Sequence, residues 1–267
     1  MIGAFTLAAA LAAAPPAASP GEARRVVSLV PSLTDIVLAL GEGTRLVGVS
    51  RFDDDPRLAG LPRVGGYLDP NVEAVVGLRP DLVLAYDGAE ESRTVSALRQ
   101  AGLRVLALHA DALPEVEASA ARVADALGDA AAGARLRRSM EATLDRVRAA
   151  ARGQPVERMA VVVGWRPLVL AGRSSYLEPL LEAVGATNVV GGDLAWPTYS
   201  VEALVAQAPA VVVDGAPEEG AAASGGVLAV LRERGTRVLR LPDGDLFRPG
   251  PRALHGLEEL ARALRGP

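Results

Sequence analysis

The chain has 267 residues, of which 50% are apolar, and a formal net charge of −4 at pH 7. This length suffices for one large domain or for two domains of ordinary size. The 28 basic residues are all arginines spread along the chain, which argues against a nucleic-acid partner. The sequence has no cysteine, and its two histidines, His109 and His255, offer little to a nitrogen-rich metal site. We therefore expect no disulfide, no thiolate chemistry and no bound metal.

The first residues form an apolar, alanine-rich run that ends in small residues and prolines. The run is short for a membrane span and resembles an export signal, although no positive charge precedes it. We expect residues 1–23 to be a signal peptide or a disordered N-terminus, with an anchoring segment as the alternative. Because no cysteine can carry a lipid, we expect a soluble periplasmic protein that is not a lipoprotein.

Apolar β-branched runs alternate with helical patterns between residues 24 and 128. This alternation predicts a parallel sheet covered by helices on both faces. Ser32, with Asp35 three residues later, resembles a capping box at the start of a helix. The expected strands are 25–30, 46–49, a short one near Val64, 82–85 and 104–108, and the expected helices are 32–40, 71–79, 92–101 and 114–127.

No strand interrupts residues 129–153. Within this stretch Leu136, Met140, Leu144 and Val147 recur at helical spacing and form one apolar stripe. A helix of this length spans about 35 Å. It predicts a stiff connection between two lobes, with little room for large closure motions.

Alternation resumes in residues 154–267, so the predicted fold is α/β, with two Rossmann-like lobes of mostly parallel sheet joined by one long, rigid α-helix. Residues 215–226 are rich in glycine, alanine and acidic residues and predict a surface loop. The expected strands are 158–163, 168–171, 188–190, 211–213 and 237–241, and the expected helices are 175–184, 200–208, 227–234 and 251–264.

One sequence pattern, here called the repeated phrase, occurs twice, in residues 71–84 and 200–213. Each copy has a capping residue, a glutamate two places later, and a proline before an apolar strand. A single repetition at this distance favours two similar lobes over a solenoid. The glutamates, Glu73 and Glu202, are explained equally well by favourable interaction with the helix dipole or by docking of matched carboxylates on a two-fold symmetric partner.

Aromatic residues are rare, at 3% of the chain, yet most follow predicted strands or precede predicted helices. Ligands of open α/β sheets bind in that region. Local packing would account for any one ring, but the whole set predicts two facing surfaces suited to a large flat ligand. The seven rings are Phe52, Tyr67, Tyr86, Trp165, Trp196, Tyr199 and Phe247.

The sequence contains no common catalytic or nucleotide-binding motif, so we do not expect an enzyme. Asp53, Asp54 and Asp55 could bind a cation, although a solvated turn is the simpler interpretation. His109 and His255 are expected to be surface or core residues.

Several segments resemble the periplasmic substrate-binding proteins of ABC importers whose lobes are joined by one long helix, most closely the vitamin B12-binding members. The resemblance covers residues 25–264. The segments that carry it are Arg-Val-Val-Ser-Leu-Val-Pro-Ser-Leu-Thr-Asp from Arg25, Val-Gly-Val-Ser-Arg-Phe-Asp-Asp-Asp-Pro from Val47, the Asn-Val-Glu phrase from Asn71, and Trp196-Pro197 through Glu202.

The resemblance implies a protein that captures a corrinoid, such as cobalamin, and passes it to an ABC permease dimer. It implies ligand contacts by Phe52, Tyr67, Tyr86, Trp196 and the 245–248 loop, including Arg248, with Glu73 and Glu202 docking on permease arginines. No resident cofactor is expected, and the protein should be a monomer.

The sequence departs from the vitamin B12-binding members at some of these positions. Those members have tryptophans at the positions of Tyr67 and Tyr86 and another aromatic at Leu246, while haem-binding relatives place an axial tyrosine near Tyr67. Haem is therefore the second candidate ligand. A ferric siderophore, with a basic cleft made by Arg51, Arg166, Arg173 and Arg248, is the third. A cleft enzyme acting on a tetrapyrrole is the alternative outside this class.

Overall fold

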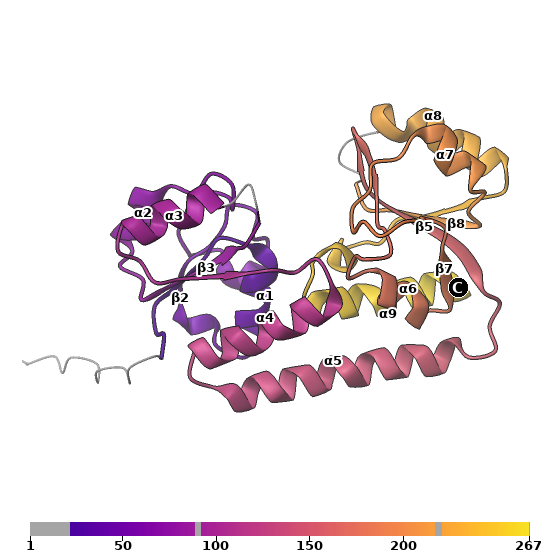
Figure 1. Cartoon of the computed structure of the whole chain (residues 1–267). Helices are drawn as coiled ribbons and strands as arrows, with labels where there is room; N and C mark the ends of the chain where they lie inside the picture. Colours follow the sequence, from indigo (N-terminus) through magenta and orange to yellow (C-terminus); the bar gives the residue numbers. More distant parts are fainter. Residues whose placement is uncertain (1–21, 89–91, 217–220, 267) are drawn as a thin grey trace, which may run out of the picture.

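A computed structural model of the chain shows two α/β lobes joined by one long helix (Figure 1). The structure describes residues 22–88, 92–216 and 221–266. The predicted signal segment, residues 1–23, lies outside the described residues except for Glu22 and Ala23. The two-lobed α/β fold expected from the alternation of elements is confirmed.

The N-terminal lobe is built on a parallel sheet of order β2-β1-β3-β4. Successive residues of β3 serve opposite faces: Leu82 and Leu84 pack with helices α1 and α4, whereas Val83 and Ala85 pack with α2 and α3. This explains why the strand is a continuous apolar run. The elements are β1 (Val26–Ser28), α1 (Pro31–Ala39), β2 (Leu46–Gly48), α2 (Val72–Gly77), β3 (Leu82–Tyr86), α3 (Ser92–Gln100), β4 (Val105–Leu108) and α4 (Leu113–Ala126), with 3-10 turns η1 (Gly43–Arg45) and η2 (Pro56–Leu58).

The C-terminal lobe has a mostly parallel sheet of order β6-β5-β8-β9, with β7 also paired to β5 and with β6 antiparallel. Met159 and Val161 of β5 face α5, α6 and α9, and Ala160 and Val162 face α7 and α8. The elements are β5 (Glu157–Trp165), β6 (Leu168–Leu170), α6 (Glu178–Ala183), β7 (Ala186–Asn188), α7 (Val201–Ala206), β8 (Val211–Asp214), α8 (Ala221–Glu233), β9 (Arg237–Leu239), η4 (Asp245–Phe247) and α9 (Pro251–Arg265).

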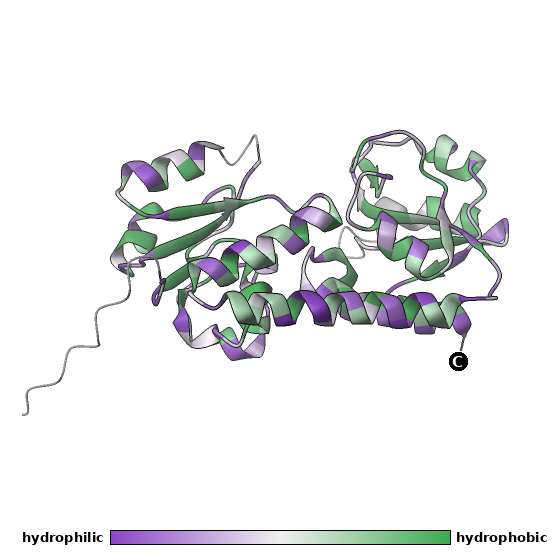
Figure 2. Cartoon of the chain, turned by 60° about the horizontal axis from the view of Figure 1, so that its bottom comes forward, coloured by the Kyte–Doolittle hydropathy of each residue, from purple (hydrophilic) through white to green (hydrophobic). Residues whose placement is uncertain are grey.

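The expected linking helix is α5, Ala130–Ala151, which runs beneath both lobes (Figure 1). Its first turn is capped by the carboxylate of Asp129, which accepts a hydrogen bond from the Ala132 amide at 2.7 Å. Met140, Leu144 and Val147 are buried, as their spacing predicts, and Figure 2 shows hydrophilic residues between the hydrophobic ones. The buried stripe packs into the core of the C-terminal lobe, so α5 is an integral part of the fold.

The repeated phrase forms the same structure twice. Helices α2 and α7 have the same length, and each is capped by a side chain: Asn71 accepts from the Ala74 amide at 2.9 Å, and Ser200 from the Ala203 amide at 3.1 Å. The residue before each proline also has the same unusual backbone, with φ of 48° at one site and 45° at the other. The predicted internal repeat is confirmed.

Three local predictions were wrong. Helix α1 begins at Pro31 without a side-chain cap, and Ser32 and Asp35 are buried, so they form no capping box. Residues 221–226 belong to helix α8 and not to a loop. The strand expected near Val64 is replaced by two isolated bridges, Val49 with Arg63 and Gly65 with Pro70. In α1 the Asp35 side chain contacts arginines of the C-terminal segment instead of capping its own helix.

Helix α9 depends on a glycine that faces the η4 turn. A Cβ at Gly256 would clash with the backbone amide nitrogen of Leu246. We expect Gly256→Ala to lower the free energy of unfolding by about 1–3 kcal/mol, because backbone cannot move aside as a flexible side chain can. The matched control is Gly226→Ala in α8, where a Cβ meets nothing within 4 Å. It should raise stability by up to about 1 kcal/mol. Urea denaturation measures the free energy of unfolding of both variants. Equal changes in the two variants would contradict the close contact at Gly256.

Candidate functional site

A cleft of about 560 Å³ lies between the lobes. Its N-terminal wall is formed where β1, β2, β3 and β4 end, as expected for ligand sites of parallel sheets. Five of the seven predicted aromatic residues line it, and Ser32, Asp111 and Arg248 add polar groups. The aromatic lining residues are Phe52, Tyr67, Tyr86, Trp196 and Phe247.

The rings of the N-terminal wall are open to solvent. Phe52 is 52% exposed and Tyr67 is 37% exposed. The Arg51 guanidinium lies 5.1 Å from the centroid of the Phe52 ring, and it binds the Asp69 carboxylate at 2.6 Å. These contacts restrict Phe52 from one side, so its other face remains available to a ligand.

Trp196 connects the two walls. Its indole Nε1 donates a hydrogen bond to Asp111 Oδ1 at 3.0 Å, and Asp111 follows β4 of the N-terminal lobe. The ring also packs edge-on against Tyr176, with centroids 5.8 Å apart. Burial raises the pKa of the Tyr176 phenol, whose hydroxyl donates to the Leu246 carbonyl at 3.1 Å. Trp196 is thus held in one orientation by residues of both lobes.

Two predicted ligand-binding aromatics lie elsewhere. Trp165 is only 5% exposed, and its Nε1 donates to Asp214 Oδ1 at 2.9 Å within the C-terminal lobe. The hydroxyl of Tyr199 accepts a hydrogen bond from the Gly191 amide at 3.2 Å. Neither is among the described residues that line the cleft. The β5–β6 hairpin explains the first case, because it pairs Trp165 with Leu168 and turns the ring into the core.

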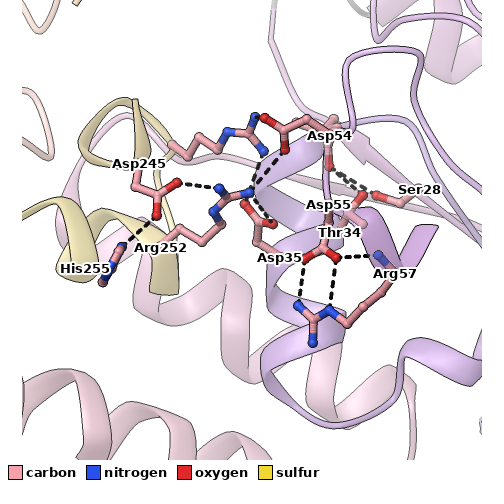
Figure 3. A network of polar contacts seen from close by, with 11 residues as sticks. Ser28, Thr34, Asp35, Asp54, Asp55, Arg57, Asp245, Arg252 and His255 are labelled. Atoms are coloured by element: carbon pink, nitrogen blue, oxygen red, sulfur yellow. Dashed lines mark hydrogen bonds and ion pairs between the residues drawn. The ribbon is translucent and has the colours of Figure 1, made fainter. Parts of the chain in front are cut away.

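A set of charged residues, here called the interlobe network, ties the C-terminal segment to the N-terminal lobe (Figure 3). Arg252 of α9 lies 3.2 Å from Asp54, 3.7 Å from Asp35 and 2.5 Å from Asp245. Arg248, at the cleft, pairs with Asp54 and lies 3.8 Å from Asp35. Sequence reasoning missed this network, because nothing local shows that α1 and α9 meet.

Burial and ion pairing shift the pKa values of Asp35 and Asp54 in the network and of the neighbouring Asp53. Burial raises the pKa of Asp35 to about 6, against the opposing effect of Arg252 and Arg248. It also raises the pKa of Asp53 to about 6, against a hydrogen bond from Thr34. Burial would raise the pKa of Asp54 too, but its pairing with Arg248 and Arg252 lowers it below the ordinary value. Asp54 is therefore the anion that holds the two arginines.

We expect the stability of Asp35→Asn relative to the natural protein to depend on pH. A carboxyl whose pKa rises on folding stabilises the fold fully below about pH 4, and this contribution is lost as the pH rises through about 6. Asparagine cannot ionise, so the variant should match the natural protein at pH 4 and exceed its free energy of unfolding by about 1–3 kcal/mol at pH 7.5.

The control for this prediction is Asp55→Asn. Its hydrogen bonds with Arg57 lower the pKa of Asp55, so its contribution is present at neutral pH and is lost as the pH falls. At pH 7.5 Asp55→Asn should therefore have a lower free energy of unfolding than the natural protein. Chemical denaturation across pH measures both variants. A loss of stability in Asp35→Asn at pH 7.5 would mean that the ion pairs outweigh the cost of burial.

Glu73 and Glu202 lie at equivalent places, in the first turns of α2 and α7, and both are exposed. Figure 1 shows these helices on the sides of their lobes away from α5. The pKa of the Glu202 carboxyl lies below its usual value, because it accepts hydrogen bonds from its own backbone amide and from Ser200. Neither glutamate is among the described residues lining the cleft.

None of the described helices, the 22-residue α5 included, has an apolar stretch long enough to cross a bilayer.

Comparison with known proteins gives consistent matches over most of the chain. The periplasmic binding protein family model matches residues 26–224. An ABC transporter substrate-binding lipoprotein of Bacillus subtilis is 29% identical over 252 residues, covering 91% of this chain and 80% of that protein. A vitamin B12-binding protein of Vibrio cholerae is 25% identical over 256 residues, covering 93% and 91%. The crystal structure of a periplasmic haem-binding protein from Pseudomonas aeruginosa superposes with a TM-score of 0.75 at 30% identity, covering 90% of this chain and 92% of that one.

Proposed function

The chain belongs to the periplasmic binding protein family, and on that premise we propose that it captures a corrinoid, cobalamin being the reference ligand, and delivers it to an ABC import permease. The observation that carries the proposal is the cleft, where aromatic rings from both lobes face the same space. Rings on two opposed walls suit a large flat ligand, because each can bury its face against the ligand plane. The role is binding rather than catalysis, as in the family.

The charges of the cleft favour a corrinoid over haem. A corrin carries neutral amide side chains, whereas haem carries two carboxylates. Arg248 is the one cation among the described residues that line the cleft, and Asp35 and Asp54 already neutralise it. Asp111 adds a carboxylate that can accept hydrogen bonds from amides and would repel a propionate. The described lining residues therefore interact more favourably with neutral amide groups than with anionic groups.

Haem remains the second candidate because of Tyr67. Its ring lines the cleft, and its hydroxyl makes no hydrogen bond to any residue that the structure describes. A tyrosine oxygen is an established axial ligand of haem iron. A ferric siderophore is less favoured, because Arg166 and Arg173 are not among the described lining residues.

Calorimetric titration with cyanocobalamin and with haemin tests the ligand. We expect cyanocobalamin to bind, and Phe52→Ala and Trp196→Ala each to weaken it about tenfold or more, because each removes a ring that covers the ligand. Tyr199→Phe, which alters an aromatic residue outside the cleft, should leave the affinity unchanged. The proposal would be wrong, and haem the ligand, if the protein bound haemin tightly but not cyanocobalamin. In that case the absorbance band of the bound haem should disappear in Tyr67→Phe.

The same premise leads us to propose that Glu73 and Glu202 dock on the permease, with a single copy of this protein on a permease dimer. Their helices are copies of one structural unit, and both carboxylates are exposed on the side of the lobes away from α5 (Figure 1). A two-fold symmetric partner presents two equivalent surfaces, which matched groups on two similar lobes can contact together. Paired cations on the partner would complete the contact.

The double variant Glu73→Gln with Glu202→Gln tests docking. It should retain full affinity for the ligand but no longer stimulate ATP hydrolysis by the reconstituted permease, because the change removes charge from residues that do not line the described cleft. Glu182→Gln, an exposed glutamate of α6, is the control and should behave as the natural protein. Loss of ligand affinity in the double variant would return both residues to a structural role.

An extracytoplasmic location is part of this proposal. The Bacillus subtilis relative is named as a lipoprotein. The expectation of a soluble form without a lipid anchor therefore stays a prediction, as does cleavage of a signal peptide.

A further inference from the structure

We propose that Asp243, His255 and Glu259, here called the C-lobe triad, bind a divalent transition-metal ion at a site separate from the cleft. Each residue offers one ligand atom, and these atoms lie within 4.8 Å of one another. None of the three is among the described residues that line the cleft. The proposal does not depend on the identity of the transported ligand.

Local structure explains how the triad assembles. His255 and Glu259 are four residues apart on α9, so their side chains share one face of the helix. Asp243 belongs to the loop that leads from β9 into η4. Gly244 has a φ of 63°, a left-handed conformation that suits glycine, and it turns the chain between Asp243 and η4.

Glu259 indicates that this is more than a cluster of surface charges. Only 9% of its side-chain surface is exposed, and its Oε2 atom has no hydrogen-bond partner among the described residues. Its Oε1 atom forms a long ion pair, 4.0 Å, with the mostly exposed Arg262, and this distance is too far for a hydrogen bond. A buried carboxylate in this state is unfavourable. A metal ion would supply the missing partner.

His255 is already oriented as a metal ligand. Its Nδ1 lies 2.9 Å from Asp245 Oδ2, and Arg252 lies 2.5 Å from the other Asp245 oxygen (Figure 3). With Nδ1 engaged by this carboxylate, Nε2 is the ring nitrogen that can bind a metal ion. A carboxylate that holds a histidine in this way is the usual support of a metal-binding imidazole.

The donor set selects the class of metal. One imidazole nitrogen with two carboxylate oxygens suits zinc and neighbouring first-row ions, whereas magnesium and calcium favour oxygen ligands alone. His255 is 53% exposed, so solvent water can reach the imidazole and complete the coordination. The shortage of histidines argues against a metal site built from nitrogen ligands, whereas the proposed site needs only one imidazole.

Zinc titration of the metal-free protein by calorimetry tests the proposal. We expect one site, and at least about a tenfold loss of affinity in His255→Gln and in Glu259→Gln, since each loses a ligand. The matched control is His109→Gln, because His109 also lies near a carboxylate, Asp87 at 3.4 Å, but belongs to no described triad. This variant should bind zinc as the natural protein does, and millimolar magnesium or calcium should not displace zinc.

Thermal unfolding separates loss of the site from loss of the fold. Without metal, Glu259→Gln should unfold at the same temperature as the natural protein or higher, because the change removes a buried carboxylate whose only ion pair is a long one with an exposed arginine. Zinc should raise the unfolding temperature of the natural protein and of His109→Gln, but not of Glu259→Gln. Unchanged zinc binding in both triad variants, or its loss in His109→Gln, would overturn the proposal.

Discussion

The buried face of α5 is the constraint on which the relative placement of the lobes depends. Met140, Leu144 and Val147 share one core with α6, α9 and the lower face of the C-terminal sheet, and Ala110 and Val116 of the N-terminal lobe belong to the same core. Bending this helix would expose a continuous apolar surface, which costs about 25 cal/mol per Å². We therefore expect the two walls of the cleft to keep a nearly constant separation, so that ligand capture would rely on a site largely formed in advance.

The C-terminal segment provides a second connection, and it also delivers side chains to the cleft. Gly256 allows η4 to lie against α9, which places Phe247 and Arg248 beside the N-terminal wall. Arg252 then anchors α9 to Asp35 and Asp54. Because these ion pairs are partly buried, they specify one arrangement more than they add net stability. The raised pKa of Asp35 shows the cost of burying a carboxylate there.

The proposed activities use different faces of the molecule. The cleft presents aromatic rings around a carboxylate and a neutralised arginine, which suits a flat ligand with neutral polar groups. The exposed glutamates of α2 and α7 lie on the lobes away from α5 (Figure 1). The C-lobe triad meets the interlobe network at Asp245, which contacts both His255 and Arg252. A metal ion there would strengthen the anchoring of α9 without entering the cleft.

The sequence by itself determined the α/β alternation, the linking helix and the repeated unit, because strand and helix periodicity and the caps at Asn71, Asp129 and Ser200 act over a few residues. It also indicated five of the rings that line the cleft. Only the tertiary structure decided that Trp196 lines the cleft while Trp165 lies in the core, although each follows apolar residues in the sequence. The same holds for the pairing of Asp35 with Arg252 and for the meeting of Asp243 with His255. Such contacts join segments whose approach is set by the packing of whole helices on a sheet, and no local pattern records that packing.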